Sequence, residues 1–399
     1  MIPNPLLLQT AAPPIPEAKA WAERYGGSAG PLIDLSQAVP GYPPHAELLE
    51  RLGRAASSLE AAAYGDIAGD ISLRGAYAGH VSALYGARIR AENVAITAGC
   101  NMAFFVAVLS LARAGDAVLL PTPWYFNHKM ALDMLGVEAV PLPCRAQSGF
   151  VPEVEAARRL MSERVRAIVL VTPNNPTGAI YPPATIAAFK ALCTEHGAAL
   201  ILDETYRDFI GSDAAPHSSL SDTDWDATIV QIYSFSKSYC IPGHRVGALI
   251  AGAGMLSETA KILDTLQICA PRSPQLALPW AIPALAGWRA ENAAEIRRRA
   301  EAFRQSIAQL DGWTVASIGA YFAYVAHPFI GKGDAAICER LAATRGVLCL
   351  PGSFFGPGPA GFLRIAFANV DVAQIGQLPA RLYWQARQAP RRQSDGEAY

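Results

Sequence analysis

Short runs of continuous apolar residues recur along the first two thirds of the chain. They occupy residues 94–97, 117–120, 167–171, 199–202 and 228–233. Because their apolar residues are continuous instead of alternating with polar ones, these runs predict strands that are buried on both faces of a sheet. Helical patterns such as residues 183–196 lie between them, so the repeating unit is a strand followed by a helix. The order predicts an α/β fold with a mostly parallel sheet between helices.

A proline-rich entry at Pro43 and Pro44 leads into the first long helical pattern, which starts at Ala46. Apolar residues recur there at helical spacing and are expected on one face: Leu48, Leu49, Leu52, Ala55 and Ala56. From this helix onward the alternation of strands and helices predicts a large domain over residues 46–283.

A different pattern begins near Gly287. Residues 288–310 predict a long helix with a strongly charged face, and strand-like segments follow it at residues 323–326, 347–350 and 363–368. This order predicts a smaller α+β domain formed by residues 284–399, with residues 1–45 packed on it. The polar, charged tail from Arg391 is expected to fray.

The charge balance of the 399 residues is nearly neutral, with 33 Lys and Arg against 34 Asp and Glu. Neither sign dominates, so we expect no nucleic acid and no membrane surface as a partner. Charged residues make up 17% of the chain, and 51% are hydrophobic. So few charges favour a large core and a subunit interface. The longest uncharged run, residues 96–112, contains a glycine turn near its start and predicts a strand, a turn and a core helix instead of a membrane span.

Seven cysteines, odd in number and widely scattered without a CxxC pair, predict reduced thiols in a cytoplasmic protein. Residues 1–16 have no basic region before their apolar residues and are interrupted by prolines, so we expect no signal peptide. Cys193 and His196 lie one helical turn apart, but no second ligand pair accompanies them, and we expect no metal site.

Two glycine motifs stand in the wrong context for catalysis. Residues 26–30 fit the GxSxG pattern of a hydrolase, but a helical pattern precedes them where a strand is required. Residues 356–361 fit GxGxxG, yet they carry two prolines and lead into a strand. We interpret the first as a turn and the second as a loop.

Four other segments carry candidate chemistry, and three of them follow directly on predicted strands. They are Thr-Pro-Asn-Asn-Pro-Thr-Gly at 172–178, Asp-Glu-Thr-Tyr at 203–206, Ser-Phe-Ser-Lys at 234–237 continuing to Arg245 and Gly247, and Phe-Leu-Arg-Ile-Ala-Phe at 362–367. Each alone has an ordinary structural interpretation. Their joint order at strand ends, where α/β enzymes build their sites, is much harder to obtain by chance.

These motifs resemble those of the class I and II aminotransferases, which are pyridoxal-phosphate enzymes of the aspartate aminotransferase fold. The resemblance extends from about Ile33 to Ala368, and its most specific parts are Asn-Pro-Thr-Gly at 175–178, Ser-x-x-Lys at 234–237 and Arg245, eight residues after the lysine. It implies fold type I, pyridoxal 5'-phosphate as the cofactor, transfer of an amino group between an L-amino acid and a 2-oxo acid, and a homodimer with shared sites.

The resemblance also implies roles for residues around the cofactor ring. Lys237 matches the lysine that forms the Schiff base and moves a proton, and Asp203 matches the carboxylate that keeps the pyridine nitrogen protonated. The alternatives are a surface lysine and a helix N-cap, and in either case we expect Glu204 to face solvent. Asn175 and Tyr206 match the pair that hydrogen-bonds the phenolic oxygen; the alternatives are an Asx turn and core packing.

The phosphate is expected to contact Ser234, Arg245 and the turn at Gly99, Cys100 and Asn101, with position 100 acting only through its backbone at the start of a helix. Tyr125 resembles the aromatic residue that stacks on the ring, with Trp124 as the competing candidate. Tyr64 resembles the tyrosine that reaches the phosphate of the neighbouring subunit, and ordinary packing is the alternative.

Arg364 matches the residue that clamps the substrate α-carboxylate, and the alternative is a structural ion pair at a strand end. Ala38 stands near the substrate where the family often has glycine, so its methyl group is expected to narrow the pocket or shift the chain. Arg272 is equally well interpreted as a ligand for a distal carboxylate or as a surface arginine. Substrate preference therefore stays open.

Two other functions remain as alternatives. A lyase on the same scaffold, eliminating from sulfur amino acids, or a related synthase would use the same lysine and cofactor. A non-catalytic cofactor-binding or regulatory protein is a third interpretation, but the chain adds no DNA-binding module, and Lys237, Asp203 and Arg364 are all present.

Overall fold

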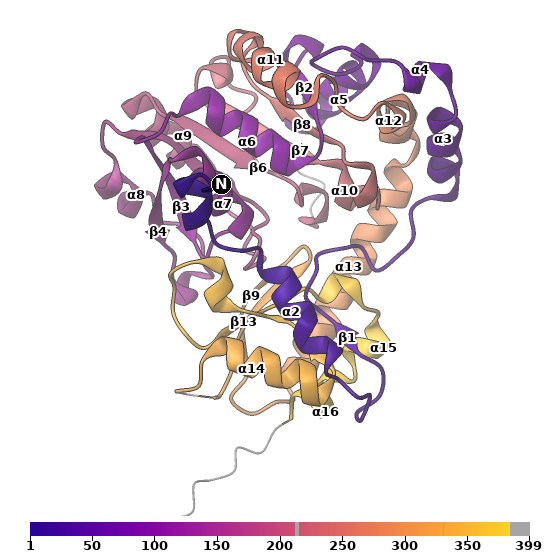
Figure 1. Ribbon diagram of the computed structural model, residues 1–399, viewed down its shortest axis with the longest axis vertical. Coiled ribbons are helices and arrows are strands. Elements are labelled where there is room, and N and C mark those ends of the chain that lie inside the picture. Colours follow the sequence, from indigo (N-terminus) through magenta and orange to yellow (C-terminus); the bar gives the residue numbers. More distant parts are fainter. Residues whose placement is uncertain (212–214, 330, 384–399) are drawn as a thin grey trace, which may run out of the picture.

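The computed structural model describes residues 1–211, 215–329 and 331–383. Its upper part in Figure 1 contains a seven-stranded sheet with the order β2-β8-β7-β6-β5-β3-β4. The strands are β2 (Val94–Thr97), β3 (Ala117–Thr122), β4 (Glu138–Pro143), β5 (Val165–Val171), β6 (Ala199–Asp203), β7 (Ile229–Ser234) and β8 (Gly247–Ile250). All neighbours are parallel except β8, which runs antiparallel to both β2 and β7. The prediction of a mostly parallel sheet is confirmed.

The five strands predicted from apolar runs correspond to β2, β3, β5, β6 and β7. Two strands of this sheet were not predicted. β4 lies at the edge and contains Pro141 and Pro143, which strand patterns normally exclude from central positions. β8 is short and begins at Gly247, which the sequence analysis had placed at the end of a candidate site segment.

Helices cover both faces of this sheet (Figure 1). One side carries α3 (Ala46–Ala56), α4 (Leu59–Ala62), α5 (Ile71–Tyr85), α8 (Val154–Leu160), α9 (Pro183–His196) and α12 (Arg272–Ala284), and the other carries α6 (Cys100–Leu111), α7 (Phe126–Leu135) and α11 (Ala253–Gln267). Alternate residues of β6 point to the two sides: Leu200 and Leu202 pack with the first set, and Ile201 with the second. Both sheet faces are therefore core.

The first predicted helix forms as α3, and Leu48 and Leu52 are buried. Leu49 is 45% exposed and Ala56 is also exposed, so the expectation that they share the buried face was wrong. Because 3.6 residues complete a turn, Leu49 lies about 100° around the helix from Leu48, beyond the edge of the packed stripe.

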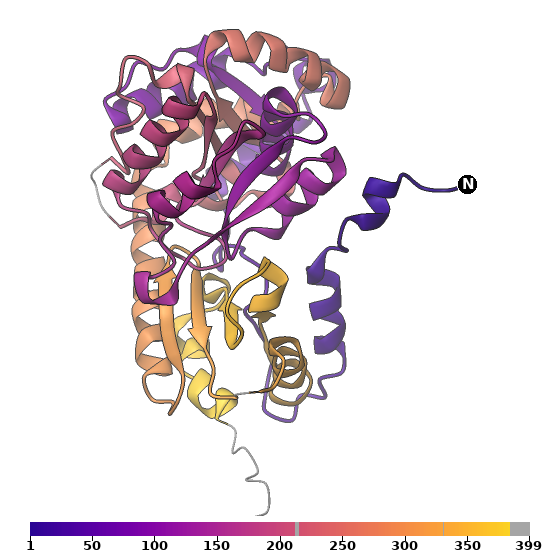
Figure 2. The ribbon, with the colours of Figure 1, turned by 90° about the vertical axis from the view of Figure 1, so that its left-hand side faces the viewer.

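The lower part contains a four-stranded antiparallel sheet, β12-β13-β10-β9, and a parallel pair, β1 and β11. The bounds are β1 (Ile33–Asp34), β9 (Thr314–Gly319), β10 (Phe322–Ala326), β11 (Val347–Leu348), β12 (Leu350–Pro351) and β13 (Phe362–Ile365). The predicted strand at 347–350 is divided into β11 and β12, and the one predicted at 363–368 forms β13, which ends at Ile365. Strand β9 was not predicted. The predicted helix 288–310 forms as α13 (Ala286–Ile307), which runs from the upper into the lower part (Figure 2).

The N-terminal segment contributes to both parts. Helix α2 (Pro14–Glu23) packs on α14 (Asp334–Arg340) and β11, whereas α1 (Pro5–Gln9) contacts α7 of the upper part. The remaining helices are α10 (Phe235–Ser238), α15 (Val372–Ile375) and α16 (Leu378–Leu382). The exact boundaries of a domain at residues 46–283 stay a prediction, and the tail from Arg391 lies outside the described residues.

Both glycine motifs that the sequence analysis rejected as catalytic lie in irregular structure. Residues 26–30 form turns after α2, and residues 356–361 form a loop that leads into β13. The uncharged run 96–112 contains the end of β2, a turn and α6, as expected. Across the described residues, the helices all lack either the length or the apolar character that crossing a bilayer requires.

Candidate active site

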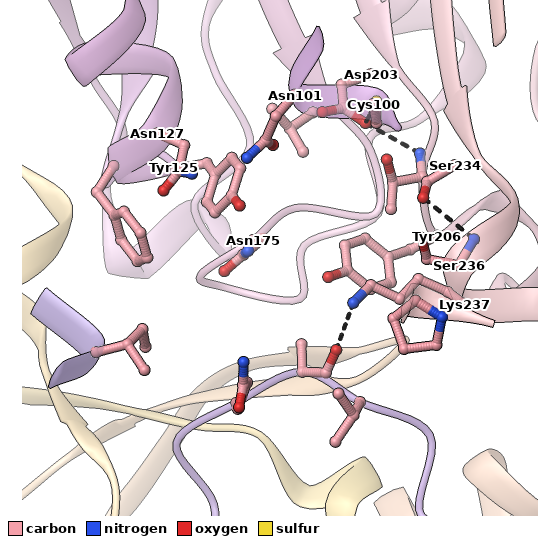
Figure 3. Close-up of a pocket in the computed structure, with 18 of the residues that line it drawn as sticks. Cys100, Asn101, Tyr125, Asn127, Asn175, Asp203, Tyr206, Ser234, Ser236 and Lys237 are labelled. Atoms are coloured by element: carbon pink, nitrogen blue, oxygen red, sulfur yellow. Dashed lines mark hydrogen bonds between the residues drawn. The ribbon is translucent and has the colours of Figure 1, made fainter. Parts of the chain in front are cut away.

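A cavity of about 450 Å³ opens at the carboxyl ends of β5, β6 and β7 and reaches residues of the lower part (Figure 3). Its lining includes most of the predicted site residues: Ala38, Cys100, Asn101, Tyr125, Asn175, Asp203, Tyr206, Ser234, Lys237, Arg245 and Arg364. Parallel strands deliver their last residues to one edge of a sheet, which explains why segments distant in sequence meet here. Ser36, Gln37 and Val39 close the cavity from the N-terminal segment.

Asp203 is the last residue of β6 and is 5% exposed. Its Oδ1 accepts a hydrogen bond from the backbone N–H of Thr205 (3.0 Å), and its Oδ2 lies 3.3 Å from His128 Nε2. His128 is itself buried in α7 and stacks on Phe104 with ring centroids 3.8 Å apart. The sequence interpretation missed His128. The only available signal was its position one helical turn after Tyr125.

Glu204 does not face solvent, and the expectation that it would was wrong. It is fully buried, and its carboxylate accepts hydrogen bonds from Tyr85 Oη (2.6 Å) and Gln231 Nε2 and lies 2.9 Å from His217 Nε2. Burial alone would raise the pKa of this carboxyl, but His217 and Arg207 hold the pKa below its usual value. Because the sheet is covered on both faces, a residue that points away from Asp203 enters the other core.

Lys237 lies in the one-turn helix α10, and its amine donates a hydrogen bond to the backbone carbonyl of Ala38 (Figure 3). Burial, together with the positive charges of Arg245 and Arg364, lowers the pKa of this amine to about 8. A substantial neutral fraction is therefore present near physiological pH, as a nucleophilic or proton-accepting amine requires.

One part of the cavity lining is suited to an anion. Helix α6 begins at Cys100 after Gly99, and within the described residues no side-chain hydrogen bond caps its N-terminus. Arg245 donates to the carbonyls of Pro242 (3.0 Å) and Ala98 (3.3 Å). A Cβ at Gly99, whose φ is +91°, would lie 2.1 Å from Arg245 Nη2, so only glycine allows this approach.

Two serines belong to the same part of the lining. Ser234 caps α10, and its Oγ accepts from the N–H of Ser236 (3.2 Å). Ser236 Oγ is buried and has no hydrogen-bond partner among the described residues. An unpaired buried hydroxyl, a guanidinium and a helix N-terminus together fit a phosphate group. Ser236 was not predicted to contribute.

Arg364 lies in β13 and is 2% exposed. It donates to the carbonyl of Ser36 and to Asn175 Oδ1 (3.4 Å), and its Nε has no partner among the described residues. Burial lowers its pKa to about 10. The described residues place no carboxylate within ion-pair distance of it, so the alternative of a structural ion pair gains no support.

The aromatic side chains divide between the cavity and the core. Tyr206 and Tyr125 line the cavity, and burial raises the pKa of both hydroxyls, that of Tyr125 to about 12. Trp124 is absent from the cavity lining, and the backbone of Gly356 packs against its indole ring. Between the two candidates for ring stacking, the geometry favours Tyr125.

Two predicted residues lie away from the cavity of this chain. Tyr64 is 78% exposed. Arg272 pairs with Asp70 (3.2 Å) and Glu60 (3.7 Å) and donates to the carbonyl of Ala63, so it is already engaged by its own chain. Conversely, Pro13 and Ile15 of the N-terminal segment line the cavity, although no sequence motif marked them.

The comparisons with known proteins agree on one family. The sequence profile described as "Aminotransferase class I and II" matches residues 31–382. The chain is 30% identical to a valine–pyruvate aminotransferase of Mycobacterium tuberculosis, covering 91% of this chain and 94% of the relative. It is 28% identical to an aromatic aminotransferase of Arabidopsis thaliana, with 88% of each chain covered.

Among solved structures, the chain resembles YbdL of Escherichia coli, which is described as having a methionine aminotransferase function. The TM-score is 0.87 at 26% identity, covering 96% of this chain and 99% of YbdL. An aspartate aminotransferase of Thermotoga maritima gives a TM-score of 0.86 at 23% identity, covering 95% and 98%, and shows the same fold. The expected fold is confirmed.

Proposed function

The chain belongs to the class I and II aminotransferases and exchanges amino groups between amino acids and 2-oxo acids, and we propose that it does so with pyridoxal 5'-phosphate held in the cavity described above. One observation carries the proposal: the amine of Lys237, the carboxylate of Asp203 and the guanidinium of Arg364 line a single cavity of about 450 Å³. When bound, pyridoxal phosphate supplies a ring that accepts electrons from the substrate Cα.

The residues of the cavity fit this cofactor. Asp203, buried beside His128, would keep the ring nitrogen protonated. Asn175 and Tyr206 would hydrogen-bond the phenolic oxygen, and Tyr125 would stack on the ring. The phosphate would be held by a group of hydrogen-bond donors at and near the start of α6 and α10: Ser234, Ser236, Arg245 and the backbone N–H groups of Gly99, Cys100 and Asn101.

Lys237 is the proposed attachment point and proton carrier. With its pKa lowered to about 8, the amine would take a proton from the substrate Cα and deliver it to C4′ of the cofactor, on the other side of the amino nitrogen. Arg364 would bind the substrate α-carboxylate with two parallel N–H groups and thereby hold Cα within reach of the amine. Ala38 would limit the room beside the substrate with its methyl group.

We propose a homodimer in which Tyr64 reaches the phosphate of the neighbouring subunit. Its 78% exposure leaves the hydroxyl available to a second copy of the chain. We also propose a cytoplasmic location, which is supported by seven cysteines that all lack a disulfide partner in the described residues.

Elimination is not favoured, because the relatives reported above are aminotransferases. Their names cover valine, aromatic and methionine substrates, so the amino donor of this chain stays open. The third interpretation, a non-catalytic protein, is not supported by the family assignment.

The cofactor proposal is tested by absorbance. Purified protein mixed with pyridoxal phosphate is expected to develop a visible band that is lost in Lys237→Ala. Incubation with a series of amino acids, without an added 2-oxo acid, should release one equivalent of 2-oxo acid per site. Persistence of the band in Lys237→Ala would refute the attachment point, and sustained release of pyruvate would indicate elimination.

A further inference from the structure

A cluster of polar side chains lies beside the turn that carries Lys237 but outside the lining of the cavity. Its centre is Asp208, in the 3₁₀ turn η3 (Arg207–Phe209) that begins directly after Tyr206. The side chain of Asp208 is 13% exposed and that of its partner Arg289 is 10% exposed. The roles proposed above for the active site leave this cluster unused.

The carboxylate of Asp208 joins three elements. Its Oδ2 accepts hydrogen bonds from Tyr233 Oη (2.7 Å) in β7 and from Ser238 Oγ in α10. Its Oδ1 accepts from Arg289 Nη1 (2.9 Å) in α13. The hydroxyl groups of Tyr233 and Ser238 lie 2.9 Å apart, so both converge on the same oxygen.

Ser238 is the residue directly after Lys237. Helix α10, which carries both, is only four residues long. A helix of one turn has no stability of its own, so its position depends on the contacts that hold it. The lysine amine lies at the end of a flexible four-carbon stem, and a shift of the backbone therefore moves the amine away from its working position.

The electrostatic surroundings favour a charged carboxylate at position 208. Although burial alone would raise its pKa, the guanidinium groups of Arg289 and Arg207 hold the pKa of Asp208 below its usual range. Arg207 lies 3.7 Å from Glu204, so a second carboxylate shares the positive charge. Hydrogen bonds to an ionised acceptor are stronger than those between neutral groups, and Ser238 and Tyr233 each donate one.

We propose that Asp208 is a positioning residue for amino transfer: by accepting from Ser238 it fixes the turn that aims Lys237 into the cavity, and by pairing with Arg289 it ties that turn to helix α13. The inference rests on the proposed role of Lys237. Asp208 itself touches neither substrate nor cofactor and acts through the backbone on either side of Ser238.

The test compares three variants in steady-state turnover with an amino acid that the wild-type protein accepts and a 2-oxo acid as the acceptor. Asp208→Ala is expected to lower kcat by about 10- to 100-fold, because a misplacement of about 1 Å in a reacting group has an effect of that size. KM for the amino acid and the affinity for pyridoxal phosphate should change by less than about threefold, since Arg364 and the phosphate site are intact.

The other two variants separate positioning from folding. Asp208→Asn keeps an oxygen that accepts from Ser238 and should recover part of kcat. Ser238→Ala removes one hydroxyl without adding bulk and should lower kcat by several-fold, so it tests the contact even where Asp208→Ala fails to fold.

The matched control for Asp208→Asn is Asp334→Asn. Asp334 is also buried and accepts from the N–H of Gly361 (2.9 Å), but it lies in the lower part. It should lower the melting temperature and leave kcat unchanged.

Folded Asp208→Ala and Ser238→Ala proteins with wild-type kcat would overturn the positioning role. An equal loss of kcat in Asp334→Asn would do the same, because it would reduce the effect to general destabilisation. A wild-type protein that shows neither a visible band nor turnover would overturn the proposed function itself, which is a distinguishable result.

Discussion

At the scale of single residues, two buried basic side chains determine which chemistry the cavity supports. Lys237 and Arg364 carry ordinary side chains whose behaviour is set by burial, which lowers the pKa of the amine to about 8 and that of the guanidinium to about 10. The amine therefore changes charge near physiological pH, whereas the guanidinium stays charged. The amine is therefore suited to proton transfer, and the guanidinium, which stays charged, is suited to binding a carboxylate.

The lowered pKa of Lys237 predicts a pH profile. Well below pH 8 the neutral, reactive fraction of the amine falls about tenfold per pH unit, so labelling of the cofactor-free protein by an amine reagent should rise with that slope and level off above pH 8. Peptide mapping of the labelled lysine measures the rate. Exposed Lys261 serves as an internal reference for reagent access. A rate at Lys237 that still climbs tenfold per unit above pH 9 would contradict the lowered pKa.

Replacing Arg364 by lysine should impair substrate binding without removing the charge. A single ammonium cannot reproduce the two parallel N–H groups, and a loss of about 2 kcal/mol corresponds to a roughly 30-fold lower kcat/KM. The loss should appear mainly in KM for the amino acid. Arg381→Lys is the control, because Arg381 is also buried but bonds to the carbonyls of Arg345 and Pro31 in the lower part. Equal effects in both variants would exclude the proposed clamp.

The sequence motifs predicted most of the residues that line the cavity, but they missed Ser236 inside one motif and missed residues from distant segments. Asp203 was found because it follows a buried strand, and its neighbour His128 was missed because it comes from α7, far away in the chain. Glu204 was misjudged because its environment depends on which helices cover the second face of the sheet. The partners that bury it, Tyr85 and His217, lie outside its motif.

At the scale of elements, the approach of α6 to Arg245 depends on a single glycine. Gly99→Ala should weaken binding of pyridoxal phosphate by at least about tenfold, because the added methyl group meets Arg245 and the φ of +91° is unfavourable for alanine. Gly86→Ala is the matched control, since Gly86 also has a positive φ (+61°) but open space around it. An absorbance titration measures both. Equal affinities in the two variants would refute the phosphate assignment.

Strands were predicted where burial makes the pattern continuous. β5, β6 and β7 are buried on both faces and were found, whereas edge strand β4 mixes exposed and buried positions. β9 likewise has only partly buried residues after its exposed first one. Strands with partly exposed residues therefore leave a weak hydrophobic pattern. β8 is an exception, since it is fully buried but was missed; it has only four residues and begins at Gly247.

At the scale of the whole molecule, the proposed sharing of sites between subunits can be tested by mixing. If Tyr64 serves the neighbouring subunit, a mixed dimer of Tyr64→Ala and Lys237→Ala chains contains one intact site. Random exchange of subunits should then restore about a quarter of wild-type activity from two impaired parents. Activity that never exceeds the sum of the parents would place Tyr64 outside a shared site, and sedimentation that shows a stable monomer would reject the dimer.

The pairing of β1 with β11 has a consequence for how the protein is made. Residues 33 and 347 are neighbours in this pair, and the carbonyl of Ser36 accepts from Arg364, so the segment around residue 33 can pair only after residues 347–364 have been synthesised. The seven-stranded sheet is complete by residue 250 and can form while synthesis continues. A chain interrupted before Arg364 would therefore contain Lys237 and the residues of the anion site but lack the guanidinium proposed to bind the substrate carboxylate, so we expect it to be inactive.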